Sequence, residues 1–136
     1  MRYLAFLAAI SLTACTSASG PSTTTPGVGE MPSNEILIYR RAEAGVAANV
    51  APAPAILLDG RAIGTCRIAQ PILIRLPEGA WTVTALTANG QVSQDVRVGE
   101  GDRVNLRCGT SSVPPLSPAP TLVEVETEVA QKEAGL

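Results

Sequence analysis

The sequence predicts an all-β protein, a small antiparallel β-sandwich of about seven to eight strands. From residue 35 onward, short runs of β-branched and aliphatic residues recur about every ten residues, separated by Gly, Pro, Asn and Asp. Within several runs, apolar and polar residues alternate, as they do in strands that bury one face and expose the other. The chain has 136 residues, which is room for one such domain.

Seven strands are expected first in chain order, at residues 35–40, 53–59, 61–67, 70–76, 80–88, 91–98 and 103–108. The alternation of apolar and polar residues predicts which side chains of a strand point toward the core and which point toward solvent. In the last run, Val104 and Leu106 lie on the side opposite Arg103 and Arg107. The Ala-rich residues 41–52 separate the first two strands and are expected to form a long connection.

Turn residues set the connections between these strands. Asp59-Gly60 and Asn89-Gly90 are each a strong signal for a two-residue hairpin turn, which requires positive φ at its central residues. Two further turns are expected at residues 76–79 and 99–102. Adjacent strands joined by such short turns pair antiparallel, so the turns support the predicted sandwich.

The C-terminal region is expected to add one strand and a short helix. Residues 110–120 contain four prolines and are predicted to be a Pro-rich loop, because proline cannot pair within a central strand. Residues 121–126 alternate valine with glutamate and are predicted to be a strand. Good helix formers follow, and Thr127 is placed to cap a short helical turn within 121–136.

The N-terminus has the features of an export signal. Arg2 precedes an apolar run at residues 3–12, which is too short for a permanent membrane span. The segment Leu12-Thr13-Ala14-Cys15 resembles the bacterial lipobox. That resemblance implies a signal peptide at 1–14 and a mature chain that begins with a lipidated Cys15, and Thr16 after it is similar to the version that directs lipoproteins to the outer membrane.

The three cysteines agree with this interpretation. An odd count leaves a spare thiol in an oxidising compartment, but lipidation of Cys15 leaves Cys66 and Cys108, which we expect to form a structural disulfide. A redox pair is the alternative for these two residues. Residues 15–34 are rich in Ser, Thr, Gly and Pro and are predicted to be the lipidated cysteine and a flexible linker. The folded domain then spans residues 35–109.

A family resemblance supports the same fold. Residues 76–85 resemble the PEGA domain and carry the literal Pro77-Glu78-Gly79-Ala80, and residues 56–64 are similar to its Asp-Gly hairpin. Residues 35–136 as a whole also resemble an uncharacterised domain of bacterial lipoproteins. The resemblance implies a prealbumin-like or carboxypeptidase-regulatory-like β-sandwich that serves as a binding module and brings no catalytic residue. The cysteine pair and the Ala-Pro stretch at 41–54 depart from it.

Composition narrows the function. The chain has no histidine, so the commonest general base and metal ligand is missing. Its formal net charge of −2 argues against a sequence-independent nucleic-acid binder, which needs a concentrated basic face. We therefore expect no enzyme, no catalytic residue, no metal, no cofactor and no nucleic-acid partner.

Few side chains are candidates for a binding surface. Trp81 is expected to fill the core rather than to bind a ligand. The turn acids are expected to be solvated (Asp59, Glu78, Glu100 and Asp102). Five arginines are expected to form a modest basic face (Arg40, Arg41, Arg97, Arg103 and Arg107). Three glutamates are expected on a solvent-exposed edge strand, with pairing to those arginines as the alternative (Glu124, Glu126 and Glu128).

Together these observations predict a lipoprotein anchored in the outer membrane through Cys15 and facing the periplasm. Non-enzymatic binding or assembly with an envelope protein is the expected function, and binding of a glycan or peptidoglycan is the alternative. The working surface is expected at a sheet edge or at a cluster of the Asp59-Gly60 and Asn89-Gly90 turns.

Overall fold

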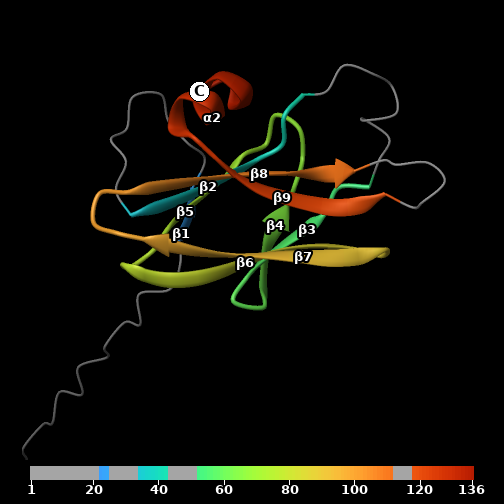
Figure 1. The fold of residues 1–136 in the computed structure, drawn as a ribbon, viewed down its shortest axis with the longest axis horizontal. Coiled ribbons are helices and arrows are strands. Elements are labelled where there is room, and N and C mark those ends of the chain that lie inside the picture. The colour runs from blue at the N-terminus through green and yellow to red at the C-terminus, as the bar shows by residue number, and fades with distance from the viewer. Residues whose placement is uncertain (1–21, 25–33, 43–51, 112–117) are drawn as a thin grey trace, which may run out of the picture.

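A computed structural model describes residues 22–24, 34–42, 52–111 and 118–136. Two β-sheets pack face to face, and a C-terminal helix lies on one of them (Figure 1). In spatial order, the five-stranded sheet contains β1 (Ser22–Thr24), β5 (Ile72–Arg75), β2 (Glu35–Tyr39), β8 (Arg103–Ser111) and β9 (Ala119–Val125). The four-stranded sheet contains β4 (Arg61–Thr65), β3 (Ala55–Leu58), β6 (Gly79–Thr87) and β7 (Gly90–Val98). The predicted all-β sandwich is confirmed.

Strand pairing is antiparallel throughout these sheets except between β2 and β8, which run parallel from Glu35↔Arg103 to Tyr39↔Arg107. Parallel neighbours need a long connection, and here the chain passes through the whole four-stranded sheet between them. On one side of the sandwich β7 lies against β9, so the two sheets approach each other along that edge.

The core lies between the sheets and consists of the inward-facing members of each alternating strand. The face predicted for β8 is confirmed, because Leu106 is fully buried in this core and Val104 packs against it. The largest contributions come from aliphatic side chains of five strands (Ile36, Ile38, Ile56, Leu58, Ile74, Val83 and Leu106). Trp81 packs against the margin of this core but is only partly buried, so the prediction that it fills the core is confirmed only in part.

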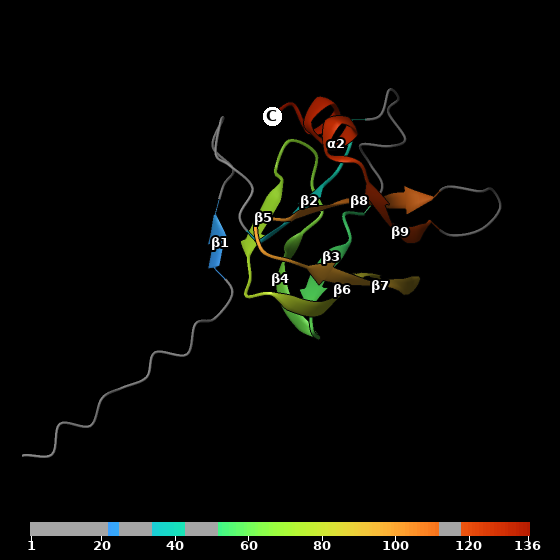
Figure 2. The same cartoon turned by 60° about the vertical axis from the view of Figure 1, so that its left-hand side comes forward.

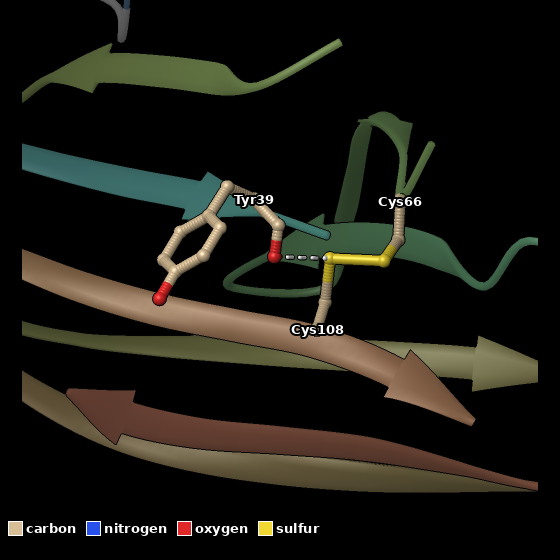
Figure 3. The surroundings of a disulfide bond; sticks show 3 residues. All are labelled: Tyr39, Cys66 and Cys108. Carbon is tan, nitrogen blue, oxygen red and sulfur yellow. Dashed lines mark hydrogen bonds between the residues drawn. A yellow bond between two sulfur atoms is a disulfide. The ribbon is translucent and has the colours of Figure 1, made fainter. Parts of the chain in front are cut away.

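A disulfide joins the two sheets, as expected. Cys66 directly follows β4 and Cys108 lies in β8, with their Cα atoms 6.1 Å apart (Figure 3). Figure 3 also shows the Cys108 sulfur against the Tyr39 carbonyl oxygen, an S···O distance of 3.3 Å. The crosslink closes a loop of 42 residues, which in the chain-entropy treatment stabilises the fold by about 4 kcal/mol. That figure is comparable with the whole net stability of a small domain.

The two hairpin predictions are confirmed, with one change of register. Asp59 and Gly60 have φ values of +46° and +79° and join β3 to β4 as the two-residue turn requires. In the second hairpin, Thr87 pairs with Gly90, so the loop residues are Ala88 and Asn89. Gly90 begins β7 with φ +150°, a value that favours glycine.

Two segments are more regular than the sequence predicts. Ser22–Thr24, expected within the flexible linker, forms β1 and pairs antiparallel with β5 (Figure 2). The ends of the Pro-rich segment also pair, because Thr110 is opposite Pro120 in the β8–β9 ladder. Pro120 is tolerated there because β9 is the last strand of its sheet. The predictions for residues 1–21, 25–33, 43–51 and 112–117 lie outside the described residues.

The helix is longer than the predicted turn and covers part of a sheet face that was expected to meet solvent. In α2 (Thr127–Ala134) the N-cap position is Glu126 rather than the predicted Thr127, no side chain makes a capping hydrogen bond there, and the helix ends at Gly135 in the left-handed region. Ala130 is fully buried and packs with Leu37, Tyr39 and Leu73 on the outer face of the five-stranded sheet. All five residues of β2 are consequently buried.

The outer face also buries a carboxylate. Glu35 is fully buried and is directly opposite Arg75 on β5 and Arg103 on β8 in the strand register. Its Oε1 accepts a hydrogen bond from Arg75 Nε at 3.0 Å, and its Oε2 accepts one from Arg103 Nη2 at 2.8 Å. Both carboxylate oxygens are therefore satisfied, as a buried charge requires.

We predict that Glu35→Gln lowers the free energy of unfolding by about 3 kcal/mol, because it removes the charge that compensates Arg103 in a buried site. Urea denaturation monitored by circular dichroism measures the change. The matched control is Glu124→Gln, at an exposed residue of β9, which we expect to change stability by less than about 0.5 kcal/mol. Equal losses in the two variants would contradict a specific role for the buried carboxylate.

Candidate functional site

The outer face of the five-stranded sheet carries a polar cluster where α2 ends. Glu133 of α2 accepts a hydrogen bond from the Tyr39 hydroxyl at 2.7 Å. Arg107 Nη1 lies 3.0 and 3.1 Å from its two carboxylate oxygens, and Arg41 Nη1 lies 3.4 Å from Oε1. One glutamate therefore binds a tyrosine and two arginines from two neighbouring strands, and this holds the end of the helix against the sheet.

This cluster shifts the titration of its members. Burial raises the pKa of Tyr39 to about 12, and the hydrogen bond to the Glu133 carboxylate adds to that increase. The Tyr39 hydroxyl, followed by Arg107, lowers the pKa of Glu133. Because the pKa of Glu133 is lower in the folded protein than its ordinary value of 4.5, the ionised carboxylate stabilises the fold at pH values above 4.5. This stabilisation is lost as the pH falls below 4.5 and through the folded-state pKa.

A hollow of about 250 Å³ lies beside the cluster. We call it the arginine pocket, because Arg40, Arg41 and Arg107 line it together with five residues of β8 and β9 (Cys108, Gly109, Thr110, Thr121 and Val123). The predicted basic face is therefore assembled only in part. Arg103 belongs to the Glu35 pair, and Arg97 lies exposed on the other sheet.

A second hollow, of about 290 Å³, opens beside the Asp59-Gly60 turn. Leu58, Ile63 and Trp81 form its apolar wall, and Asp59 and Arg61 are its charged lining residues. We call it the tryptophan pocket.

Short hydrogen bonds hold two residues of the tryptophan pocket in place. The Trp81 indole Nε1 donates to the Pro77 carbonyl at 3.2 Å. The Thr82 amide donates to Asp59 Oδ1 at 2.9 Å. An aromatic ring beside an arginine and a carboxylate can provide both apolar contact and polar hydrogen bonds to a small ligand.

Other expected features do not form one site. The Asp59-Gly60 and Asn89-Gly90 turns were expected to cluster, but they lie at opposite ends of the four-stranded sheet, because β3 and β6 are antiparallel with Leu58 opposite Val83 and Ala55 opposite Leu86. The predicted cluster is wrong for that reason. The glutamates of the C-terminal strand and helix are exposed, as expected (Glu124, Glu126 and Glu128). Among the arginines of the predicted basic face, Arg103 pairs with Glu35, and Arg41 and Arg107 pair with Glu133.

Sequence analysis missed the two acids that organise this surface. The sequence pattern marks Glu35 only as the first residue of the strand expected at 35–40, and Glu133 falls among the unnamed helix formers of residues 121–136. A weak signal was present for each, since Glu35 begins a run that is otherwise apolar, and Glu133 lies three residues after Ala130 on the same helix face. Neither signal identifies the arginine partner, which depends on how the strands are ordered in the sheet.

Comparison with known proteins finds no family model, no curated protein and no solved structure that matches this chain. The resemblance to the PEGA domain therefore stays a prediction. Within the described ranges, no three metal-ligating side chains gather in one place. No helix of the described part is both long enough and apolar enough to cross a membrane.

We predict that Tyr39 ionises with a midpoint near pH 12. In a Tyr3→Phe chain, Tyr39 is the single tyrosine, so tyrosinate absorbance reports on it alone. Because an unfolded tyrosine ionises near 10.0, folding stability should fall as the pH rises from about 10 to about 12. Glu133→Gln should move the midpoint down, with burial still holding it above 10.0. A midpoint at 10.0 in the unsubstituted cluster would contradict the assignment.

Proposed function

We propose that this chain is a lipid-anchored lipoprotein of the bacterial cell envelope and that its sandwich is a non-enzymatic binding module. The proposal rests on the state of the three cysteines, of which two are paired in a disulfide and the third follows the segment that resembles a lipobox. Cys66 and Cys108 are joined in a disulfide, which is typical of an oxidising compartment. Cys15 is then the one cysteine left over, and it follows Leu12-Thr13-Ala14, the segment that resembles the lipobox.

Anchoring at Cys15 has a geometric consequence for the domain. Six residues, 16–21, separate Cys15 from β1. Fully extended, they span at most about 20 Å. With β1 paired to β5, the β1 edge of the five-stranded sheet is held within that distance of the lipid surface, and the rest of the sandwich extends toward the periplasm.

Binding through the pockets fits the structure better than strand addition at an edge. β4 is an edge strand of only five residues, and its ladder with β3 is interrupted by a bulge opposite Ile56 and Leu57. Bulges and short lengths are features that protect edges from pairing. The edge at β7 lies against β9. We therefore place the partner contacts at the arginine and tryptophan pockets.

The anchor is tested with Cys15→Ala. We expect the variant to leave the membrane fraction or to remain as the unprocessed precursor, and its mass to lack the diacylglycerol and acyl chain found on the mature wild type. Membrane fractionation and intact-mass measurement give both readouts. Cys66→Ser/Cys108→Ser is the matched control, since it also removes thiols but should keep the lipid. A mature wild-type chain without bound fatty acid would contradict the proposal.

The tryptophan pocket favours a second candidate function, binding of a glycan such as peptidoglycan. Sugar rings stack their C–H faces on indole, and their hydroxyl pairs hydrogen-bond to arginine and carboxylate groups. Trp81, Arg61 and Asp59 bring those three chemical groups to one hollow.

Trp81 is the single tryptophan of the chain, so its fluorescence should change on titration with soluble peptidoglycan fragments. Sedimentation with purified sacculi should retain the wild type and release Arg61→Ala. Arg97→Ala, which removes an exposed arginine from a neighbouring strand, is the control and should sediment as the wild type does. No fluorescence change, together with no sedimentation, would exclude the glycan and leave a protein partner.

A further inference from the structure

Two of the arginines that line the arginine pocket share one carboxylate. Arg41 and Arg107 share a single carboxylate, Glu133, at 3.4 and 3.0 Å. That carboxylate also accepts the Tyr39 hydroxyl. Arg40 brings a third guanidinium to the lining, and no acidic residue is among the described residues that line the hollow. An anion entering the pocket therefore meets Arg41 and Arg107, two guanidinium groups that share one negative charge among the described residues.

The hollow exists because a glycine occupies its floor. On the outer face of the sheet, Gly109 of β8 is opposite Thr121 of β9. The next pair on the same face is Arg107 opposite Val123. A Cβ at position 109 would lie 3.3 Å from Thr121 Oγ1 and would fill the space between the two pairs. The volume of about 250 Å³ is roughly eight times the 30 Å³ that a water molecule occupies in the liquid. A five-atom oxyanion fits, with room for part of the group that carries it.

The walls of the pocket are held in place by contacts that do not involve a ligand. Arg107 is fixed by its bonds to both oxygens of Glu133, and its side chain is one-third exposed. The next residue, Cys108, is tied to Cys66 on the opposite sheet. Arg41 is half exposed, so it can turn toward a ligand at small cost. One guanidinium is therefore preorganised and another is adaptable.

From this arrangement we propose that the arginine pocket binds a phosphate group. Planar guanidinium forks bind tetrahedral oxyanions through parallel N–H···O hydrogen bonds. The Thr121 hydroxyl, which takes part in none of the described hydrogen bonds, supplies a further donor at the floor. A phosphomonoester carries about −1.5 to −2 charges at pH 7, so it attracts guanidinium groups more strongly than a singly charged carboxylate does.

This inference goes beyond the proposed function, because it holds whether or not the chain is lipidated. Two sources can present the same chemistry, a phospholipid headgroup or a soluble phosphate ester. The test therefore compares inorganic phosphate with a short-chain phosphatidic acid, and includes acetate as a carboxylate of similar size.

The experiment is calorimetric titration of the full chain purified in detergent. We expect saturable binding with one site per chain for inorganic phosphate, phosphatidic acid or both, and at least a tenfold weaker affinity for acetate. Tighter binding of phosphatidic acid identifies the lipid headgroup as the source, and equal or tighter binding of inorganic phosphate identifies the soluble ester. Absence of saturable binding for both, or equal affinity for acetate, would overturn the proposal.

Matched variants locate the site. Arg41→Gln and Arg107→Gln should each weaken binding at least tenfold, whereas Arg97→Gln, at an exposed position of β7, should bind as the wild type does. Circular dichroism checks that each variant is folded. Because Arg107 also fixes the end of α2, Arg41→Gln is the decisive variant. Wild-type affinity in Arg41→Gln, or an equal loss in Arg97→Gln, refutes binding at this pocket.

Discussion

The burial of β2 on both faces is the constraint on which the rest of the structure depends. Every residue of Glu35–Tyr39 is buried, although an antiparallel sandwich needs to cover only the inner face of each strand. The inner residues Ile36 and Ile38 belong to the core between the sheets. The outer residues Leu37 and Tyr39 require a second cover, and α2 provides it through Ala130. The C-terminal helix is therefore part of the folded domain.

The burial of β2 also explains where the ion pairs of this sheet face lie. Glu35 begins the buried strand and needs two arginines, one from each neighbouring strand, because a buried carboxylate without partners is strongly unfavourable. At the other end, Tyr39 leads to Glu133, which attracts Arg41 and Arg107. Two acids thus account for four arginine contacts on one sheet face. The arginine pocket lies beside the second of these acids, where Arg41 and Arg107 share Glu133.

The disulfide and the β3–β4 turn lie at opposite ends of β4. The disulfide ties the end of β4 to β8 near the arginine pocket, whereas the turn between β3 and β4 lies at the tryptophan pocket. The two hollows are consequently at different ends of a rigid body. In the proposed orientation, a module held near the membrane through β1 has two separate surfaces with different chemistry, one cationic and one aromatic, available to envelope partners.

The sequence by itself determined the strand count to within one or two, the inner face of β8, the Asp59-Gly60 turn and the cysteine pair. These follow from local rules, since alternation, turn propensity and cysteine parity operate over a few residues or on a simple count. Only the tertiary structure decided that β2 and β8 run parallel, that Glu35 meets Arg75 and Arg103, and that Arg41 and Arg107 share Glu133. Those contacts join residues that are distant in the chain, so they depend on the order of strands in a sheet, which no local pattern encodes.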